Sequence, residues 1–238
     1  MNLILFTVAE TEAPLPAADP RARHIVQHLR RGRGEAFDVG LIDGPRGKAW
    51  IVESDADSLL LEFRWEDASD PPIPLILGAG FPRPQSARRI LRDTTALGVG
   101  ALHFFDADKG VPTYRESRLW STGEYRRHLV EGAEQAFSTR LPALELHSGL
   151  DAFLGSLPPD SDRLALDLYE AGAALASADL TRPGLVLAVG PERGWSARER
   201  QLLRAADFRL VHLGRRVLRS DTACLCAVGL ALHRMALL

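Results

Sequence analysis

The fold is decided by the stretch Leu185-Val186-Leu187-Ala188-Val189-Gly190-Pro191-Glu192-Arg193-Gly194-Trp195-Ser196. It opens with an unbroken apolar run, which is typical of a strand buried on both faces of a sheet. A turn containing glycine and proline follows, and Ser196 with Glu199 three residues later predicts a capped helix over 197–206. The loop therefore lies at the carboxyl end of a buried strand, where open α/β sheets bind their ligands.

This loop does not match the common nucleotide-binding motifs. It lacks the GK(S/T) ending of a P-loop and the G-x-G-x-x-G spacing of a dinucleotide-binding turn. Its glycines would let a cofactor approach the backbone closely. The same residues also fit an ordinary strand–turn–helix connection, so the loop alone leaves both interpretations open.

A second loop of the same kind follows the next predicted strand, 208–213. It reads Gly214-Arg215-Arg216-Val217-Leu218-Arg219, and Ser220 or Asp221 is expected to cap the last helix, 221–237. Two glycine-containing loops at the ends of consecutive strands can form one pocket. The arginines beside that pocket suit a phosphate-bearing substrate, and they suit a solvated surface equally well.

Strands and helices alternate through the larger part of the chain, which predicts a mostly parallel α/β sheet. Further strands are expected at 73–77, 99–105 and 163–168, and helices at 85–97, closed by Gly98, and 121–135. Residues 1–68 are richer in strand patterns, at 37–44, 48–53 and 58–65, with one helix near 20–31. The proline-rich stretch 66–74 is typical of a linker, so we place the domain boundary between residues 68 and 69.

The composition is that of an ordinary globular protein, with 46% hydrophobic and 25% charged residues. The net charge of −2 is less basic than is usual for a small nucleic-acid-binding domain, which counts mildly against a nucleic-acid partner. Lys48 and Lys109 are the only lysines among 29 basic residues, so the others are arginines. Arginine binds phosphate bidentately and stacks on bases, but codon usage produces the same bias.

No metal site is predicted. Cys224 and Cys226 have no cluster of further cysteines or histidines nearby, so they do not form a zinc site, and we expect both to be reduced core residues of a cytoplasmic protein. His24 and His28 lie one helical turn apart but lack a third ligand. The N-terminus lacks the basic segment of a signal peptide, and the apolar stretch 222–238 is too short to span a membrane.

The order of these motifs resembles the RsmE family of ribosomal RNA small-subunit methyltransferases. Residues 190–199, GPERGWSARE, are similar to the family block GPEGGFSxxE, and residues 213–223, LGRRVLRSDTA, are similar to LGxRILRTETA. The other matching blocks, in chain order, are His24, Leu29-Arg30, Gly34-Glu35, Leu97-Gly98-Val99, 131–136, Arg140-Leu141-Pro142 and Tyr169-Glu170. Together they cover most of the chain in the order that the family has.

The resemblance implies a fold, an activity and partners. The fold is α/β, with a SPOUT-type, trefoil-knotted, mostly parallel sheet in residues 69–238 and a small PUA-like β-barrel in residues 1–68. The activity is methylation of N3 of a uridine in 16S ribosomal RNA, with S-adenosylmethionine as cofactor. The enzyme is expected to be a cytoplasmic homodimer that pairs through its C-terminal domain and has no membrane partner.

Two alternatives stay open. One is a knotted methyltransferase for another RNA site, such as one in transfer RNA. The other is a diverged, non-catalytic RNA-binding protein, because Arg193 replaces a glycine of the family block and Ala96 replaces a glutamate.

The resemblance also implies site residues. The residues assigned to the cofactor are Leu168, Tyr169, Glu170, Gly190, Pro191, Glu192, Gly194, Leu213, Gly214, Val217 and Leu218. Those assigned to the RNA are His24, Arg30, Arg83, Arg88, Arg92, Arg193, Arg215 and Arg216. For catalysis, Arg219 is the first choice and Arg140 the second for stabilising the uridine anion, while Glu134 would orient an arginine or accept a proton.

Overall fold

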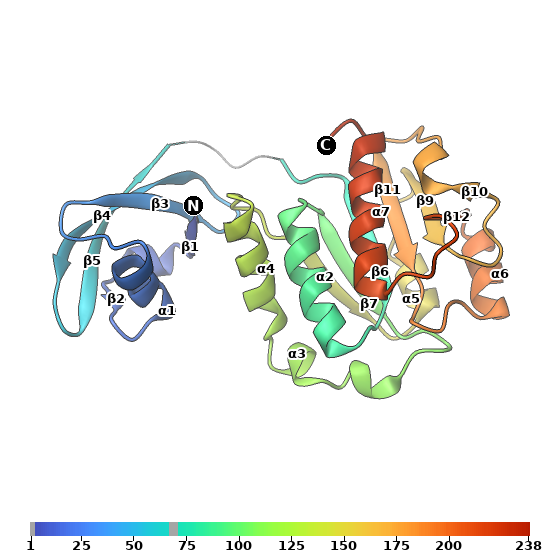
Figure 1. Cartoon of the computed structure of the whole chain (residues 1–238), viewed down its shortest axis with the longest axis horizontal. Helices are drawn as coiled ribbons and strands as arrows, with labels where there is room; N and C mark the ends of the chain where they lie inside the picture. Colours follow the sequence, from blue (N-terminus) through green and yellow to red (C-terminus); the bar gives the residue numbers. More distant parts are fainter. Residues whose placement is uncertain (1–2, 67–70) are drawn as a thin grey trace. The chain divides into compact units, whose positions relative to one another are not determined.

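The computed structural model describes residues 3–66 and 71–238, which fall into two compact units (Figure 1). The first unit contains Met1–Pro71 together with Ala133–Leu141, and the second contains Pro72–Gly132 and Pro142–Leu238. The inclusion of Ala133–Leu141 in the first unit was not expected from the sequence. The predicted boundary between residues 68 and 69 lies outside the described residues and stays a prediction.

The first unit is built on a curled five-stranded sheet with strand order β1-β3-β4-β5-β2. The strands are β1 (Ile4–Phe6), β2 (Leu15–Pro16), β3 (Ala36–Leu41), β4 (Arg46–Ser54) and β5 (Ser58–Trp65). Neighbours pair antiparallel except β1 and β3, which are parallel. Between β1 and β3 come the short helices η1 (Ala9–Thr11), α1 (Pro20–Arg23) and η2 (His24–His28). The core of this unit centres on Phe6, Ile25, Val39 and Ile51.

The second unit contains a seven-stranded sheet with strand order β10-β12-β9-β11-β6-β7-β8, in which every neighbouring pair is parallel. The strands are β6 (Leu75–Gly80), β7 (Ala101–Phe105), β8 (Ala143–His147), β9 (Ser161–Leu166), β10 (Ala173–Ala174), β11 (Gly184–Val189) and β12 (Arg209–His212). Strands β8 and β10 were not predicted from the sequence. Both are edge strands, and their exposed residues break the apolar pattern that marks a buried strand.

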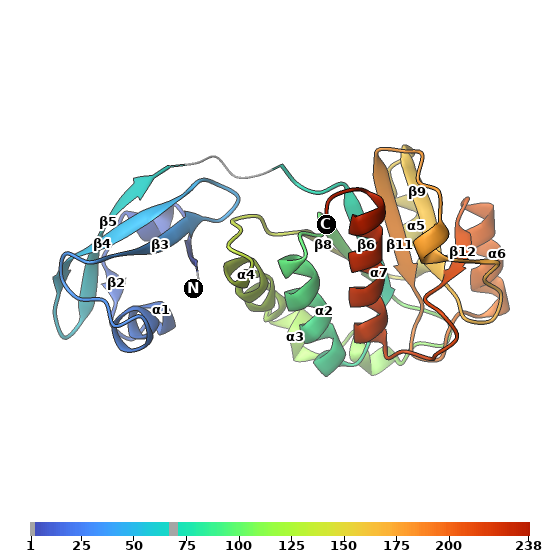
Figure 2. The ribbon, with the colours of Figure 1, turned by 45° about the horizontal axis from the view of Figure 1, so that its top comes forward.

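Helices cover both faces of this sheet, which explains the unbroken apolar run in β11. The helices are α2 (Pro84–Ala96), η3 (Pro112–Tyr114), α3 (Arg118–Ser121), α4 (Tyr125–Gln135), α5 (Leu150–Gly155), η4 (Leu175–Ser177), α6 (Ala197–Ala205) and α7 (Ser220–Arg234). Figures 1 and 2 show α2 and α7 side by side against the sheet. On the other face, Val186 packs in one cluster with Phe153 of α5 and Leu203 of α6.

Most of the predicted helix boundaries are confirmed. Ser196 accepts a hydrogen bond from the Glu199 N–H at 3.0 Å, and Glu199 accepts one from the Ser196 N–H at 2.7 Å, which is the expected capping box. Gly98 follows α2 with φ of +84°, as a C-terminal glycine should. The helix expected at 121–135 is instead divided into α3 and α4, because the chain turns at Gly123, where φ is +75°.

Two predictions about α7 are wrong. Arg219 is the N-cap residue, without a capping hydrogen bond from its side chain, and neither Ser220 nor Asp221 caps the helix. Cys224 is buried as expected, but Cys226 is exposed, because residues two apart on a helix face different directions. Both cysteines are free. Within the described residues, no helix is both long and apolar enough to cross a bilayer.

Two helical glycines offer a matched test of the packing between α4 and α2. A Cβ atom on Gly132 would lie 2.2 Å from the backbone oxygen of Arg92, whereas one on Gly229 of α7 would meet nothing within 4 Å. Gly132→Ala should therefore lower the free energy of unfolding by about 1–3 kcal/mol. Gly229→Ala should raise it by roughly 0.5–1 kcal/mol, because alanine favours a helix. Urea denaturation followed by circular dichroism measures both. A Gly132→Ala variant as stable as the parent would refute the close approach of α2 and α4.

Candidate active site

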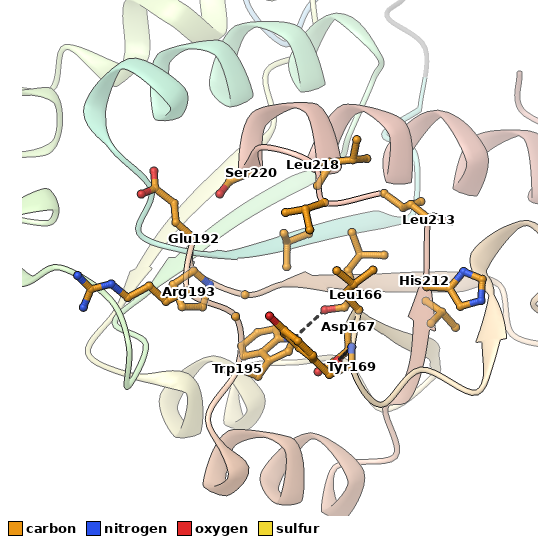
Figure 3. Close-up of a pocket in the computed structure, with 18 of the residues that line it drawn as sticks. Leu166, Asp167, Tyr169, Glu192, Arg193, Trp195, His212, Leu213, Leu218 and Ser220 are labelled. Carbon is orange, nitrogen blue, oxygen red and sulfur yellow. Dashed lines mark hydrogen bonds between the residues drawn. The ribbon is translucent and has the colours of Figure 1, made fainter. Parts of the chain in front are cut away.

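A pocket in the second unit, with a volume of about 210 Å³, lies at the carboxyl ends of three neighbouring strands, β9, β11 and β12 (Figure 3). One loop follows each strand, and the three loops form its walls, together with the first turn of α7. The lining residues are Leu166, Asp167, Leu168, Tyr169, Val189, Gly190, Pro191, Glu192, Arg193, Gly194, Trp195, Arg200, Val211, His212, Leu213, Gly214, Arg216, Val217, Leu218, Ser220 and Ala223.

The loop after β9 is held by the buried carboxylate of Asp167. Its Oδ1 accepts hydrogen bonds from the N–H groups of Tyr169 at 2.6 Å and Glu170 at 2.9 Å. Its Oδ2 accepts one from Nε of Arg200 at 2.6 Å. Burial by itself would raise the pKa of Asp167, but these hydrogen bonds, above all that from Arg200, bring its pKa below the ordinary value. The carboxylate is therefore charged and fixes the direction of the loop.

The loop after β11 is tied to the first by Trp195. This side chain is fully buried, and its Nε1 donates a hydrogen bond to the backbone oxygen of Leu166 at 2.8 Å. A Cβ atom on Gly190 would lie 3.1 Å from the indole ring, so a larger residue there would push against it. Gly194 closes the turn with φ of +68°, a conformation that favours glycine, and its N–H donates to the Pro191 oxygen at 2.8 Å.

The loop after β12 brings apolar side chains to the rim. Gly214 has φ of +110°, and its N–H donates a hydrogen bond to Nδ1 of His212 at 3.1 Å. Val217 is 82% exposed, and Tyr169, on the opposite loop, is 79% exposed. Large apolar side chains left in contact with water around a cavity are typical of a ligand-binding site.

The chain that carries this pocket is similar to known proteins. Residues 69–232 match the model of an RNA methyltransferase domain. Over 97% of its length the chain is 36% identical to the ribosomal RNA small subunit methyltransferase E of Treponema pallidum, of which the match covers 91%. The chain belongs to the ribosomal RNA small subunit methyltransferase E (RsmE) family. It is therefore an RNA methyltransferase of the RsmE type, as the order of its motifs predicted.

Solved structures share the whole architecture. The RsmE structure from Neisseria gonorrhoeae, bound to S-adenosyl methionine, matches with a TM-score of 0.80 at 20% identity, over 98% of this chain and 97% of that one. A putative methyltransferase from Legionella pneumophila, in complex with the same cofactor, has a TM-score of 0.81 at 20% identity, over 97% and 96% of the two chains. The expected α/β fold class is thus confirmed, with a SPOUT-like parallel sheet and a curled N-terminal sheet. The trefoil knot implied by the family stays a prediction.

The three loops bring together the residues that the RsmE resemblance assigned to the cofactor. All of them line the pocket except Glu170, which pairs instead with Arg204, Oε2 to Nη2, at 2.6 Å. No role was predicted from the sequence for three residues that fix the loops from beneath, Asp167, Trp195 and Arg200. A polar residue directly after a buried strand was the available signal for Asp167, but nothing local indicates its partner Arg200.

The arginines assigned to RNA are placed differently from one another. Arg193 and Arg216 line the pocket, and Arg215 is exposed beside it. Arg83 pairs with Glu192 at 3.3 Å, Arg88 with Glu124 at 2.9 Å and Arg92 with Asp93 at 2.7 Å, so each has a carboxylate near its guanidinium. His24, which is half-buried and stacks on His28, and Arg30, which is exposed, belong to the first unit.

The three catalytic candidates do not share one unit. Arg219 lies in the second unit between two pocket residues, Leu218 and Ser220, and its side chain is 71% exposed. Glu134 and Arg140 belong to the first unit. There, Oε1 of Glu134 accepts a hydrogen bond from the Leu5 N–H at 3.0 Å, and Arg140 lies 4.0 Å from Asp43.

Acid should remove the stability that Asp167 supplies. Its pKa is lower in the folded chain than in the unfolded chain, where it is about 3.9. The contribution is therefore complete above about pH 4 and is lost as the pH falls through the folded-state pKa. Asp167→Asn should lower the unfolding free energy at pH 7 by about 3 kcal/mol, because Arg200 is left without its buried partner. Urea denaturation should show this difference shrinking below about pH 4.

The control for that prediction is Asp179→Asn, which alters a carboxylate that is 89% exposed and should leave stability unchanged. A difference between the parent and Asp167→Asn that stayed constant down to low pH would contradict the assigned charge.

Proposed function

We propose that this chain transfers a methyl group from S-adenosylmethionine to N3 of a uridine in 16S ribosomal RNA. The observation that carries the proposal is the pocket formed by the three loops after β9, β11 and β12, in a chain 36% identical over 97% of its length to an RsmE enzyme. The cofactor named for the Neisseria and Legionella structures supports its assignment to this pocket.

The lining suits the chemistry of the cofactor. Leu166, Val189 and Leu218 offer an apolar wall for a planar base, and backbone groups of the loops can bind its polar edge. At Gly214, a Cβ atom would project into open space, so a ligand can lie directly against the backbone. When bound, S-adenosylmethionine supplies an activated methyl group on its positively charged sulfur. The chain itself contributes position and electrostatics.

Arg219 is the residue that we propose stabilises the reacting base. Uridine N3 carries a proton that must leave before or during methyl transfer, and negative charge then spreads onto O2 and O4. A guanidinium beside that charge lowers the barrier. Arg219 sits at the rim of the pocket, highly exposed, and its Nε is 3.9 Å from Oδ1 of Asp221, so it can turn toward a bound nucleotide. Because N3 takes part in base pairing, the target must be unpaired or flipped out.

Arg140 and Glu134 are kept as second candidates. Arg140 would supply the same positive charge, and Glu134 would orient an arginine or accept a proton. The hydrogen bond from the Leu5 N–H to Glu134 favours a structural role for that carboxylate. Arg219 ranks first because it adjoins the pocket within the same unit.

The side chain of Arg193 bears on the alternative of a non-catalytic RNA-binding protein. Figure 3 shows it extending away from Leu166, Tyr169 and Leu218. The arginine that replaces a family glycine is therefore directed away from the apolar wall, which supports retained cofactor binding. We assign Arg193, Arg215 and Arg216 to RNA phosphates, and we propose that the enzyme works in the cytoplasm as a homodimer.

A charged side chain in the apolar wall should weaken cofactor binding. Leu218→Arg places a bulky cation where the positively charged cofactor would lie, so affinity for S-adenosylmethionine should fall at least about tenfold. Leu218 is 36% exposed, so the substitution should leave the fold intact. Leu60→Arg, in the first unit at 39% exposure, is the matched control and should bind as the parent does. Isothermal titration calorimetry measures both affinities. Normal binding by Leu218→Arg would contradict the assignment of the cofactor to this pocket.

The RNA product tests the substrate. A strain lacking the gene should lose one N3-methyluridine from 16S RNA, which is detectable because that methyl group blocks base pairing and stops reverse transcription. Purified protein should restore it, and Arg219→Ala should restore it roughly 10²-fold more slowly with unchanged cofactor affinity. Methylation found on transfer RNA instead would favour the alternative substrate. Cofactor binding without transfer to any RNA would contradict the enzymatic proposal.

A further inference from the structure

Two histidines and a glutamate meet at the edge of the seven-stranded sheet, outside the pocket. His103 lies on β7, and Glu145 and His147 lie on β8, which is the edge strand. The parallel register sets His103 opposite Glu145. The side chains of His103 and His147 are only 5% and 10% exposed, whereas that of Glu145 is 53% exposed. The cluster therefore has a buried imidazole side and an open carboxylate side.

The three ligand atoms are spaced as a metal ion requires. Nδ1 of His103 lies 2.9 Å from Nε2 of His147, and Oε2 of Glu145 lies 3.9 Å from the first nitrogen and 3.6 Å from the second. Zinc binds nitrogen and oxygen at about 2.0–2.2 Å in tetrahedral geometry, which sets neighbouring ligand atoms about 3.3–3.6 Å apart. The three observed distances bracket that value, so small side-chain rotations would complete one face of a tetrahedron.

We propose that His103, Glu145 and His147 bind a zinc ion, with water at the fourth position. The half-exposed carboxylate leaves a path for the ion and for that water. No residue of the cluster lines the pocket, and β6 separates β7 from β11, so this site is distinct from the one assigned to the cofactor. Its ligands come from two adjacent strands, so the ion would fasten the edge strand β8 to β7.

A neighbouring aromatic side chain packs against both imidazoles. Phe153 of α5 packs edge-on against both rings, with centroid distances of 5.6 Å to His103 and 5.9 Å to His147. This aromatic side chain fixes their orientation. Two neutral imidazoles this close also form a hydrogen bond on their own, and a simple hydrogen-bonded pair is the rival account.

The test is a zinc titration of the full chain after treatment with EDTA and removal of any histidine tag. Calorimetry should show one zinc ion per chain, and the thermal midpoint should rise on saturation, because the ion binds the folded state. Cobalt substituted for zinc should give the visible absorption of four-coordinate cobalt. His147→Asn should abolish stoichiometric binding, and Glu145→Gln should weaken it at least about tenfold, in line with the loss of one ligand.

Matched controls separate this site from general surface binding. His233→Asn and Glu116→Gln change an exposed histidine and an exposed glutamate elsewhere, and both should bind zinc as the parent does. Glu145 is half-exposed, so Glu145→Gln keeps the proposal testable even if His147→Asn fails to fold. Absence of one-to-one binding by the parent, or equal binding by Glu145→Gln and the parent, would overturn the zinc site and leave a hydrogen-bonded histidine pair.

Discussion

The constraint on which the second unit depends is the burial of β11 on all sides. This strand hydrogen-bonds to β9 on one edge and β6 on the other, and helices cover both of its faces. Its residues must therefore be apolar without alternation, and its polar backbone groups are satisfied only by its two neighbours. Once β11 is fixed, the loop that follows it emerges beside the loop that follows β9. These two loops, with the one after β12, form the pocket.

The pocket combines a rigid polar base with an apolar rim. Beneath it, the Asp167–Arg200 ion pair and the Trp195–Leu166 hydrogen bond lock two loops to each other and to α6. Above it, Tyr169, Val217 and Leu218 remain in contact with water. Charges are costly to bury unless they are paired. Asp167 and Arg200 can both lie in the interior because each neutralises the charge of the other. Such a division keeps the loops ordered before a ligand arrives, which reduces the entropy lost on binding.

Local patterns allowed much of the fold to be predicted from the sequence. The strand at 185–189, the capping box of Ser196 and Glu199 and the glycine after α2 each depend on residues a few positions apart. Features that depend on distant residues were missed. Arg200 meets Asp167 across 33 positions, and His103 meets His147 across 44. Such pairs have no signal in a single sequence, because each residue taken alone looks like an ordinary surface or core side chain. Family motifs supplied the pocket loops, since those loops are contiguous.

The first unit is discontinuous in the chain, and this affects how the protein can be made. Its β1 strand is held by Glu134, and the turn after β3 exchanges hydrogen bonds with Thr139, whose hydroxyl donates to the Gly44 oxygen while its own backbone oxygen accepts from the Asp43 N–H. During synthesis, a nascent chain that has only reached residue 71 lacks all of these partners. The N-terminal unit therefore cannot complete its folding until residue 141 has left the ribosome. By that point, two strands and the first long helix of the other unit have already emerged.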